Sequence, residues 1–306
     1  MAVQCDLCPR YCVLTEGQSG ECRIRVNLKE ELIALTYSRP CSLHTDPVEK
    51  KPLFHFLPGS KILSLATAGC TLHCKNCQNW EISQSNPEDV EAYVLSPPEV
   101  VETALRESLP SIAYTYTDPV AFYEYALDTC IEAENKGLKN VLVTAAYANA
   151  APFKNLLKYT DAANIDLKAF SDRFYKEVCG GSLKPVLDNL VLARDAGIHV
   201  EVTNLLIPQM NDTEDEIKAL SRWIKENLGM DTPLHFSRFF PRYQMQHLSP
   251  TPSVTLLKAR EIAEAEGMRY VYIGNLYENP QEITFCPFCR KELIVRSGYV
   301  ILENHL

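Results

Sequence analysis

Three cysteines, Cys70, Cys74 and Cys77, form a C-x3-C-x2-C pattern directly after the apolar run at residues 62–68. Cysteine thiolates are the usual protein ligands of iron–sulfur clusters. Three thiolates at this spacing can hold three irons of a cubic 4Fe-4S cluster and leave the fourth iron open, whereas electron-transfer clusters use a fourth protein ligand. The pattern therefore predicts a cluster at which chemistry takes place, with a zinc site or a redox pair of thiols as the alternative.

A second group of cysteines stands near the N-terminus, in the pattern Cys5-x2-Cys8-x3-Cys12-x9-Cys22. Four cysteine ligands around a zinc ion stabilise segments that are too short to form a core of their own, so a structural zinc site is the first expectation. A second iron–sulfur cluster is the rival interpretation, because a cysteine-proline step such as Cys8-Pro9 is typical of ferredoxin cluster loops.

A third group, Cys286-Pro-Phe-Cys289, resembles one knuckle of a zinc ribbon. A ribbon needs two knuckles, and no second pair follows in the sequence. These two thiols are therefore expected either to join some of the N-terminal thiols or to bind no metal. Among the isolated cysteines, Cys130 lies in a helical pattern and is expected in the core, and Cys41 and Cys179 are given no role.

The composition limits the class of protein. The chain has 306 residues, of which 46% are hydrophobic, and its net charge is -9. This charge argues against a broad nucleic-acid-binding surface, which needs a basic face. The N-terminus has no apolar signal core, and no stretch reaches the ~18 apolar residues of a membrane span. We expect a cytoplasmic protein without membrane contact, in which cysteine clusters bind metals instead of forming disulfides.

Short apolar strands alternate with longer helical patterns between residues 61 and 275, which is typical of β/α units around a parallel sheet. The expected strands span residues 62–67, 111–116, 140–146, 162–168, 199–207, 234–239 and 270–273, and the helices span residues 120–136, 184–196, 215–227 and 254–266. Glycines at 137, 197, 229 and 267 follow these helices, as helix ends require. This pattern predicts an α/β fold, a partial (β/α)6 TIM-type barrel at residues 59–276, with a cysteine-rich N-terminal extension at 1–58 and a C-terminal extension at 277–306. The cysteine triplet then follows the first strand, at the carboxyl end where such barrels build their sites.

Four long motifs occur together, at residues 46–59, 77–83, 114–119 and 234–241. Their combination resembles the AmmeMemoRadiSam-system radical S-adenosylmethionine (SAM) enzymes, a branch close to the pyruvate formate-lyase activating enzymes, over nearly the whole chain. The resemblance implies a 4Fe-4S cluster on Cys70, Cys74 and Cys77, whose open iron is chelated by the amine and carboxylate of SAM. It also implies reductive cleavage of SAM to a 5′-deoxyadenosyl radical that abstracts a hydrogen atom from a substrate.

The resemblance carries further site residues with it. Thr117 and Asp118 fall where activating enzymes have a Gly-Glu-Pro step beside the SAM amino group, although Asp118 before Pro119 also suits a helix cap. Asp166 and Lys168 resemble the Asp-x-Lys step that meets the SAM ribose and carboxylate, and an ordinary ion pair is the alternative. His235 is expected to approach SAM from the sixth strand, and three further residues are expected to face either SAM or the substrate, namely Glu201, Asn204 and Arg238.

Two positions depart from the family pattern. Many radical SAM enzymes have an aromatic residue between the second and third cysteines, where this chain has Asn76, so adenine contacts are expected from Trp80 or from an apolar strand end. The third strand ends in Thr144-Ala145-Ala146 where relatives have Thr-Asn-Gly, and no consequence of this change is predicted.

The expected function is that of a radical SAM oxidoreductase with an unidentified substrate and an electron donor such as ferredoxin or flavodoxin. If the likeness to activating enzymes extends to function, the substrate is a glycyl residue of a partner protein. Two alternatives stay open. The substrate could be another protein, a nucleotide or a small molecule, or the chain could be an iron–sulfur electron-transfer or scaffold protein that does not cleave SAM.

Overall fold

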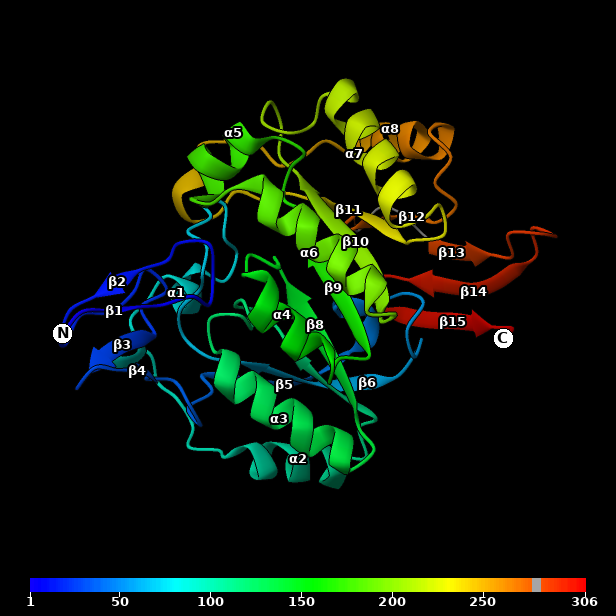
Figure 1. The fold of residues 1–306 in the computed structure, drawn as a ribbon. Coiled ribbons are helices and arrows are strands. Elements are labelled where there is room, and N and C mark those ends of the chain that lie inside the picture. Colours follow the sequence, from blue (N-terminus) through cyan, green and yellow to red (C-terminus); the bar gives the residue numbers. More distant parts are fainter. Residues whose placement is uncertain (277–281) are drawn as a thin grey trace.

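The computed structural model describes residues 1–276 and 282–306, and its centre is a curved eight-stranded sheet with the order β12-β11-β10-β9-β8-β7-β6-β5 (Figure 1). Strands β6 to β12 pair in parallel with their neighbours, whereas β5 pairs antiparallel with β6 at one edge. The bounds are β5 Ser42–Pro47, β6 Lys61–Ala66, β7 Ser111–Tyr114, β8 Lys139–Thr144, β9 Ala162–Asp166, β10 His199–Leu206, β11 Leu234–Arg238 and β12 Val271–Gly274. The expected partial barrel is confirmed, with seven parallel strands.

Among the described residues, six helices of eight or more residues pack against this sheet, and Figure 1 shows them along its outer side. Their bounds are α2 Pro97–Arg106, α3 Tyr123–Asn135, α4 Ala150–Leu157, α6 Leu183–Asp195, α7 Glu214–Asn227 and α8 Ser253–Ala265. The four expected helices are confirmed as α3, α6, α7 and α8, and the glycine after each of them has a positive φ. Helices α2 and α4 were not anticipated.

The sheet is buried on both faces, which explains why its strands read as nearly continuous apolar runs. The helices cover the outer face. Part of the inner face is filled by the segment after β5, whose fully buried Val48 and Leu53 pack in one cluster with Ile62, Ala113 and Val141. This filling leaves the carboxyl ends of the strands as the open end of the barrel.

The segments on either side of the barrel form small antiparallel sheets (Figure 1). The N-terminal segment contains two hairpins, β1 Val3–Gln4 with β2 Val13–Leu14 and β3 Arg25–Leu28 with β4 Glu31–Ala34. The C-terminal segment forms a three-stranded sheet of β13 Glu282–Phe285, β14 Glu292–Ser297 and β15 Val300–Asn304. Strand β5 lies within residues 1–58 but belongs to the central sheet, so the barrel begins before residue 59.

Short turns complete the fold near the cysteines. Helix α1 spans Trp80–Ser83, and α5 at Asp172–Phe174 continues into a π-helical turn at Tyr175–Cys179. Three 3-10 turns lie at Val48–Lys50, Pro87–Asp89 and Tyr243–Met245. None of the helices in the described part of the chain has the length and apolar character that a bilayer span requires.

Candidate active site

A cavity of about 280 Å³ opens at the carboxyl ends of the parallel strands. The three thiols of the cysteine triplet line one side of it, and polar residues from the ends of β7, β8 and β9 line another. Seven residues named from the sequence meet there, namely Cys70, Cys74, Cys77, Thr117, Asp118, Asp166 and Lys168. The strand ends therefore gather side chains from positions nearly a hundred residues apart in the chain.

The loop that carries the cysteine triplet begins at Gly69, three residues after the end of β6. The φ angle of Gly69 is 82°, and a Cβ atom there would lie 2.4 Å from the carbonyl oxygen of Cys22. Only glycine fits, because the N-terminal segment packs against the backbone at this point. The N–H groups of His73 and Lys75 then donate to the carbonyl oxygens of Cys179 and Val178, at 2.8 and 2.9 Å. The loop is thus held between the N-terminal segment and the π-helical turn.

The thiols of this loop have the hydrogen bonds that thiolate ligands accept. The backbone N–H groups of Leu72 and Asn79 hydrogen-bond to Cys70 and Cys77. The Sγ atom of Cys77 also lies 3.1 Å from the hydroxyl of Ser83. Burial raises the pKa of Cys70 and Cys77, because a buried thiolate needs a positive charge beside it. A bound metal supplies that charge and deprotonates its thiol ligands.

Two buried oxygen atoms in the cavity add to the fit for a polar ligand. The side-chain oxygens of Asn76 and Thr203 have no hydrogen-bond partner among the described residues, and both residues line the cavity. Apolar contacts come from Val143 and Leu205 near the ends of β8 and β10. The three thiols, the partnerless oxygens and this apolar wall fit a 4Fe-4S cluster with SAM bound beside it.

The Asp118 carboxylate links the ends of β7 and β8. Its Oδ1 atom accepts hydrogen bonds from the Val120 N–H at 3.0 Å and the Thr144 hydroxyl at 2.9 Å. Its Oδ2 atom accepts from the Ala145 N–H at 3.0 Å. Burial raises the pKa of Asp118, and these three donors oppose that shift. The contact to Val120 belongs to the turn that precedes α3, whose N-cap residue is Phe122, so Asp118 does not cap that helix; it lines the cavity.

Asp166 and Lys168 lie on one face of the chain at the end of β9, as the alternation of strand residues predicts. The Lys168 Nζ atom is 2.8 Å from the Asp166 carboxylate, so the two residues form the ion pair that was the alternative expectation. Both also line the cavity. An ammonium and a carboxylate with free hydrogen-bonding positions can contact the carboxylate and hydroxyl groups of SAM from this place.

A group of charged residues on another wall was missed from the sequence. Asp46, at the end of β5, accepts hydrogen bonds from Lys50 at 2.8 Å and Lys51 at 2.7 Å, and also from the hydroxyls of Ser64 and Tyr116. Lys50, Lys51 and Tyr116 line the cavity. Two ammonium groups share one carboxylate here, so this wall carries a net positive charge. The sequence signal for this charged group was the run Asp46-Pro-Val-Glu-Lys-Lys. This run does not reveal that β5 joins the central sheet, and so it does not place the two lysines at the cavity.

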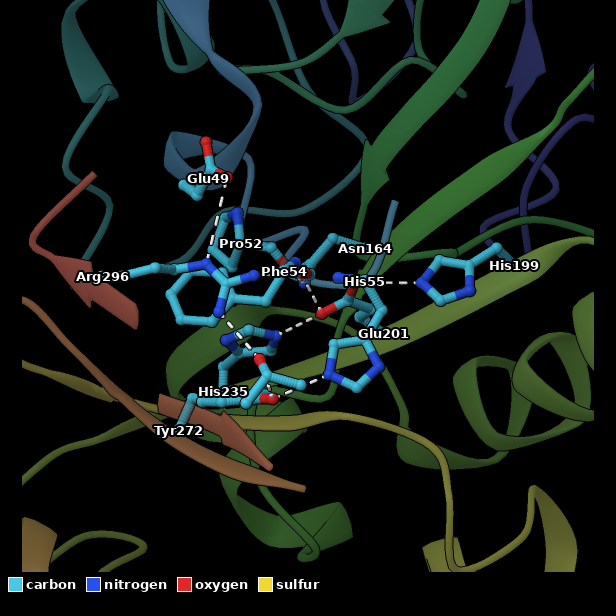
Figure 2. Close-up of polar contacts among 11 residues, drawn as sticks. Glu49, Pro52, Phe54, His55, Asn164, His199, Glu201, His235, Tyr272 and Arg296 are labelled. Atoms are coloured by element: carbon cyan, nitrogen blue, oxygen red, sulfur yellow. Dashed lines mark hydrogen bonds and ion pairs between the residues drawn. The ribbon is translucent and has the colours of Figure 1, made fainter. Parts of the chain in front are cut away.

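Contrary to the prediction, His235 does not line this cavity and belongs instead to the group of residues around Glu201 that Figure 2 shows. It is the second residue of β11, near the amino ends of the strands, and its Nε2 atom lies 2.6 Å from the carboxylate of Glu201. The Glu201 carboxylate also accepts the N–H groups of Phe54 and His55, at 3.0 and 2.7 Å, and contacts His199 at 2.9 Å. Both His235 and Glu201 thus belong to a buried network at the opposite end of the barrel from the cysteine triplet.

The remaining expectations have mixed outcomes. Trp80 does not line the cavity and instead stacks on Tyr243, with ring centroids 5.2 Å apart. Asn204 is buried and donates to the carbonyl oxygen of Leu167, and Arg238 donates to that of Thr251. Of the two expected sources of adenine contacts, only the apolar strand ends reach the cavity.

The four N-terminal thiols come together at a second, smaller cavity beside the first. The four thiols line this cavity together with other residues of the N-terminal segment and with Thr71 from the loop of the triplet. The full lining is Cys5, Leu7, Cys8, Arg10, Cys12, Leu14, Gly20, Cys22, Arg25 and Thr71. Cys286 and Cys289 do not take part, because they lie in the turn between β13 and β14, on the far side of the molecule from β1 to β4 in Figure 1. The expectation that they join the N-terminal thiols is therefore wrong.

The partial barrel and the three thiols at its open end are typical of iron–sulfur enzymes that build their site at the strand ends. A family model described as the Radical SAM superfamily matches residues 64–224, which is more than half of the chain. The chain belongs to the radical SAM superfamily, whose members use a 4Fe-4S cluster and SAM.

Several relatives agree with this placement. An uncharacterized protein of Methanocaldococcus jannaschii is 46% identical over 294 residues, which cover 96% of this chain and 87% of the relative. The pyruvate formate-lyase-activating enzyme of Clostridium pasteurianum is 23% identical over 166 residues, which cover 51% of this chain and 66% of that enzyme. A radical SAM methyltransferase from Sphaerobacter thermophilus has a similar structure, with a TM-score of 0.57 and 14% identity, over 74% of this chain and 70% of that one. The last likeness shows the fold alone.

Proposed function

We propose that this chain is an enzyme that binds a 4Fe-4S cluster through Cys70, Cys74 and Cys77 and cleaves SAM reductively. When bound, the cluster supplies the electron that splits SAM into methionine and a 5′-deoxyadenosyl radical, which abstracts a hydrogen atom from the substrate. The observation that carries this proposal is the cavity itself, where three thiols from one loop meet Asp118 after β7 and Asp166 and Lys168 at the end of β9.

The residues of the cavity would divide the work of binding SAM. Asp118 is held by three donors, and its Oδ2 atom keeps a position from which it can accept a hydrogen bond from the SAM ammonium. Lys168 and Asp166 would contact the methionyl carboxylate and the ribose hydroxyls. Val143 and Leu205 would pack on the adenine, since the family's aromatic residue is replaced by Asn76. Packed on the adenine, these two side chains would also keep water from the reacting groups.

The substrate would enter beside the positively charged wall of Lys50 and Lys51. Relatives named as activating enzymes, for pyruvate formate-lyase and for benzylsuccinate synthase, support a second candidate, in which the substrate is a glycyl residue of a partner protein. These relatives are 23% and 21% identical, so their names favour radical chemistry more than any one substrate. A small redox protein of the ferredoxin or flavodoxin type would supply the electron in either case.

An electron carrier without SAM cleavage is the weaker candidate. An electron carrier has no use for a cavity of about 280 Å³ with carboxylates and an ammonium facing the thiols. Among the described thiols outside the triplet, Cys179 is placed to supply the fourth ligand of a closed cluster, because it is buried and hydrogen-bonds to Cys74. Replacing Cys179 with Ala therefore separates the two candidates: an open cluster survives this change with its SAM response intact, and a closed cluster loses a ligand.

Single substitutions of the triplet test the ligand assignment. Cys70→Ala, Cys74→Ala and Cys77→Ala should each remove the reducible cluster and abolish SAM cleavage while the far-ultraviolet circular dichroism stays that of the wild type. Cys41→Ala is the matched control, because Cys41 lies outside the cavity. Addition of SAM should change the electron paramagnetic resonance spectrum of the reduced wild type and of the reduced Cys41→Ala control. It should produce no such change in the three triplet variants. SAM cleavage by any of the three variants would refute the assignment.

A further inference from the structure

We propose that Cys5, Cys8, Cys12 and Cys22 bind one zinc ion, and that this ion fastens the N-terminal segment to the loop of the cysteine triplet. The four residues come from a single stretch of chain, and all of them line one small cavity. This site is separate from the cavity at the strand ends, and its thiols are not needed for the proposed reaction of SAM.

The local geometry of the four cysteines suits a thiolate–metal site. Backbone N–H groups hydrogen-bond to two of the sulfurs, that of Leu7 to Cys5 and that of Arg10 to Cys8. Each donor stands two residues after its cysteine, so the chain turns around the sulfur as in a metal-binding knuckle. The Cys5 N–H also donates to the Cys12 carbonyl oxygen at 2.8 Å, which closes the loop between the first and third thiols.

Two buried polar atoms beside the thiols would gain hydrogen-bond partners if the thiols were metal-bound thiolates. The Nε atom of Arg25 and the Oγ1 atom of Thr71 have no hydrogen-bond partner among the described residues, and both residues line the cavity. Metal-bound thiolates accept hydrogen bonds and carry negative charge, so they would satisfy both atoms. Four thiolates on one Zn²⁺ leave two negative charges, which the guanidinium group of Arg10 would offset in part, and Arg25, which is paired with Glu124 at 2.6 Å, presents its Nε–H to the thiols.

The size of the cavity favours a single ion over a second cluster. The cavity at the N-terminal thiols has a volume of about 20 Å³, against about 280 Å³ for the cavity at the triplet. A space of this size holds roughly one water-sized sphere. Zinc with sulfur ligands at ~2.3 Å fits such a space. In the described parts of the chain, no three His, Cys, Asp or Glu side chains are already gathered at ion-binding distance, so zinc binding requires the thiols to turn inward.

The proposed zinc site lies next to the loop of the cysteine triplet and would help to hold that loop in place. The Cys22 carbonyl oxygen lies against Gly69, one residue before the triplet begins. Arg10 donates from Nε to the Thr71 carbonyl oxygen at 2.8 Å and from Nη2 to the Gly180 carbonyl oxygen at 2.5 Å. Cys22 and Arg10 therefore support the triplet loop from two sides. Zinc would fix both residues by closing the segment between them.

Metal analysis can test the proposal without any enzymatic assay. The triple variant Cys70→Ala/Cys74→Ala/Cys77→Ala, which lacks the ligands of the catalytic cluster, should contain one zinc per chain and no iron. Adding Cys8→Ser and Cys22→Ser should reduce the zinc to a background level. Adding Cys286→Ser and Cys289→Ser instead is the matched control and should leave the zinc in place. Iron and sulfide in the triple variant, or the absence of any metal, would overturn the proposal.

A second measurement covers the case in which the Cys8 and Cys22 variants do not fold. Titration of the folded triple variant with a thiol-binding mercurial should release zinc to a colorimetric chelator as the N-terminal thiols react. Replacement of zinc by Co²⁺ should give the intense sulfur-to-cobalt absorption of a tetrahedral four-thiolate site. Limited proteolysis should then cut within residues 5–22 only after zinc release. Cutting at the same rate before and after release would show that the ion does not fasten the segment.

Discussion

The Asp118 carboxylate accepts a hydrogen bond from the Thr144 hydroxyl at 2.9 Å and so joins the ends of two neighbouring strands at the proposed SAM site. Thr144 in turn accepts the Ala146 N–H at 2.8 Å. These contacts fix the backbone at Ala145 and Ala146, directly after the third parallel strand.

Replacement of Asp118 by Ala should weaken SAM binding by about tenfold, because one charge-assisted hydrogen bond contributes ~1.4 kcal/mol or more. Iron content should change little, since Asp118 is not a cluster ligand. The measurement is titration of the reconstituted protein with SAM. Thr144→Val is the matched control for the turn, because it keeps the carboxylate and removes one of its donors, and its loss should be smaller. Equal SAM affinity in Asp118→Ala and the wild type would leave Asp118 with only its role in joining the turns after β7 and β8.

Replacement of Gly69 by Ala should destabilise the protein and lower its cluster content. Gly17→Ala is a matched control, because Gly17 also has a positive φ, 75°, but an added Cβ there meets nothing within 4 Å. The control should cost about 1 kcal/mol, which is the price of the left-handed backbone alone. Gly69→Ala should cost several-fold more, since its Cβ would collide with the Cys22 carbonyl group. Equal losses in denaturant unfolding would show that the N-terminal segment does not press on the triplet loop.

Replacement of Arg296 by Ala should lower the free energy of unfolding by about 3 kcal/mol. Arg296 is fully buried, donates to the Phe54 carbonyl oxygen and the Thr284 hydroxyl, and lies 4.5 Å from the centre of the Phe54 ring. It therefore attaches the C-terminal sheet to the filled end of the barrel (Figure 2). Arg173→Ala, which removes an exposed pair with Glu177, should change stability by no more than about 0.5 kcal/mol. Similar losses in the two variants would contradict this role.

The acid sensitivity of the protein should depend on His55. Burial lowers the pKa of His55 to about 4, and its Nε2 atom is 2.7 Å from the Tyr272 hydroxyl. In the unfolded chain the His55 imidazole takes up a proton near pH 6.5. In the folded protein it stays neutral until about pH 4. Stability due to neutral His55 is therefore complete above pH 6.5 and is lost as the pH falls toward 4, by at most about 1.4 kcal/mol per pH unit.

Unfolding by urea at a series of pH values between 7 and 4 tests this prediction. The His55→Gln variant keeps a hydrogen-bonding group but cannot titrate, so its stability should fall less steeply with acid than that of the wild type. His247→Gln is the matched control and should keep the wild-type slope, because His247 lies outside the buried network. If the free energy of unfolding fell equally steeply with acid in the wild type and in His55→Gln, His55 would not be the cause of the acid sensitivity.

The sequence predicted the barrel well because its strands and helices have strong local signals. The seven parallel strands are buried on both faces, so each appears as an apolar run, and glycines end four of the helices. Helix α2 was missed although Ser96 and Glu99 form a capping box, since its first turn contains two prolines. Strand β5 was missed because its exposed residues alternate irregularly at the sheet edge.

The candidate site was predictable where spacing or strand position decides the geometry, as for the triplet and for Asp166 with Lys168. His235 shows the limit of this reasoning. A strand has residues facing the barrel interior along its whole length, and sequence pattern does not tell which of them reaches the open end. His235 and Ser237 are on the same strand and both face inward, but only Ser237 lines the cavity. The contribution of Lys50 and Lys51 depended on the pairing of β5, which no local signal revealed.

Anaerobic incubation of the reconstituted protein with dithionite and SAM, followed by mass spectrometry, tests the central claim most directly. The account predicts 5′-deoxyadenosine and methionine in the wild type and neither in the Cys74→Ala variant. With a full and reducible cluster in the wild type, the absence of 5′-deoxyadenosine, also after addition of candidate substrates, would contradict the proposed cleavage of SAM.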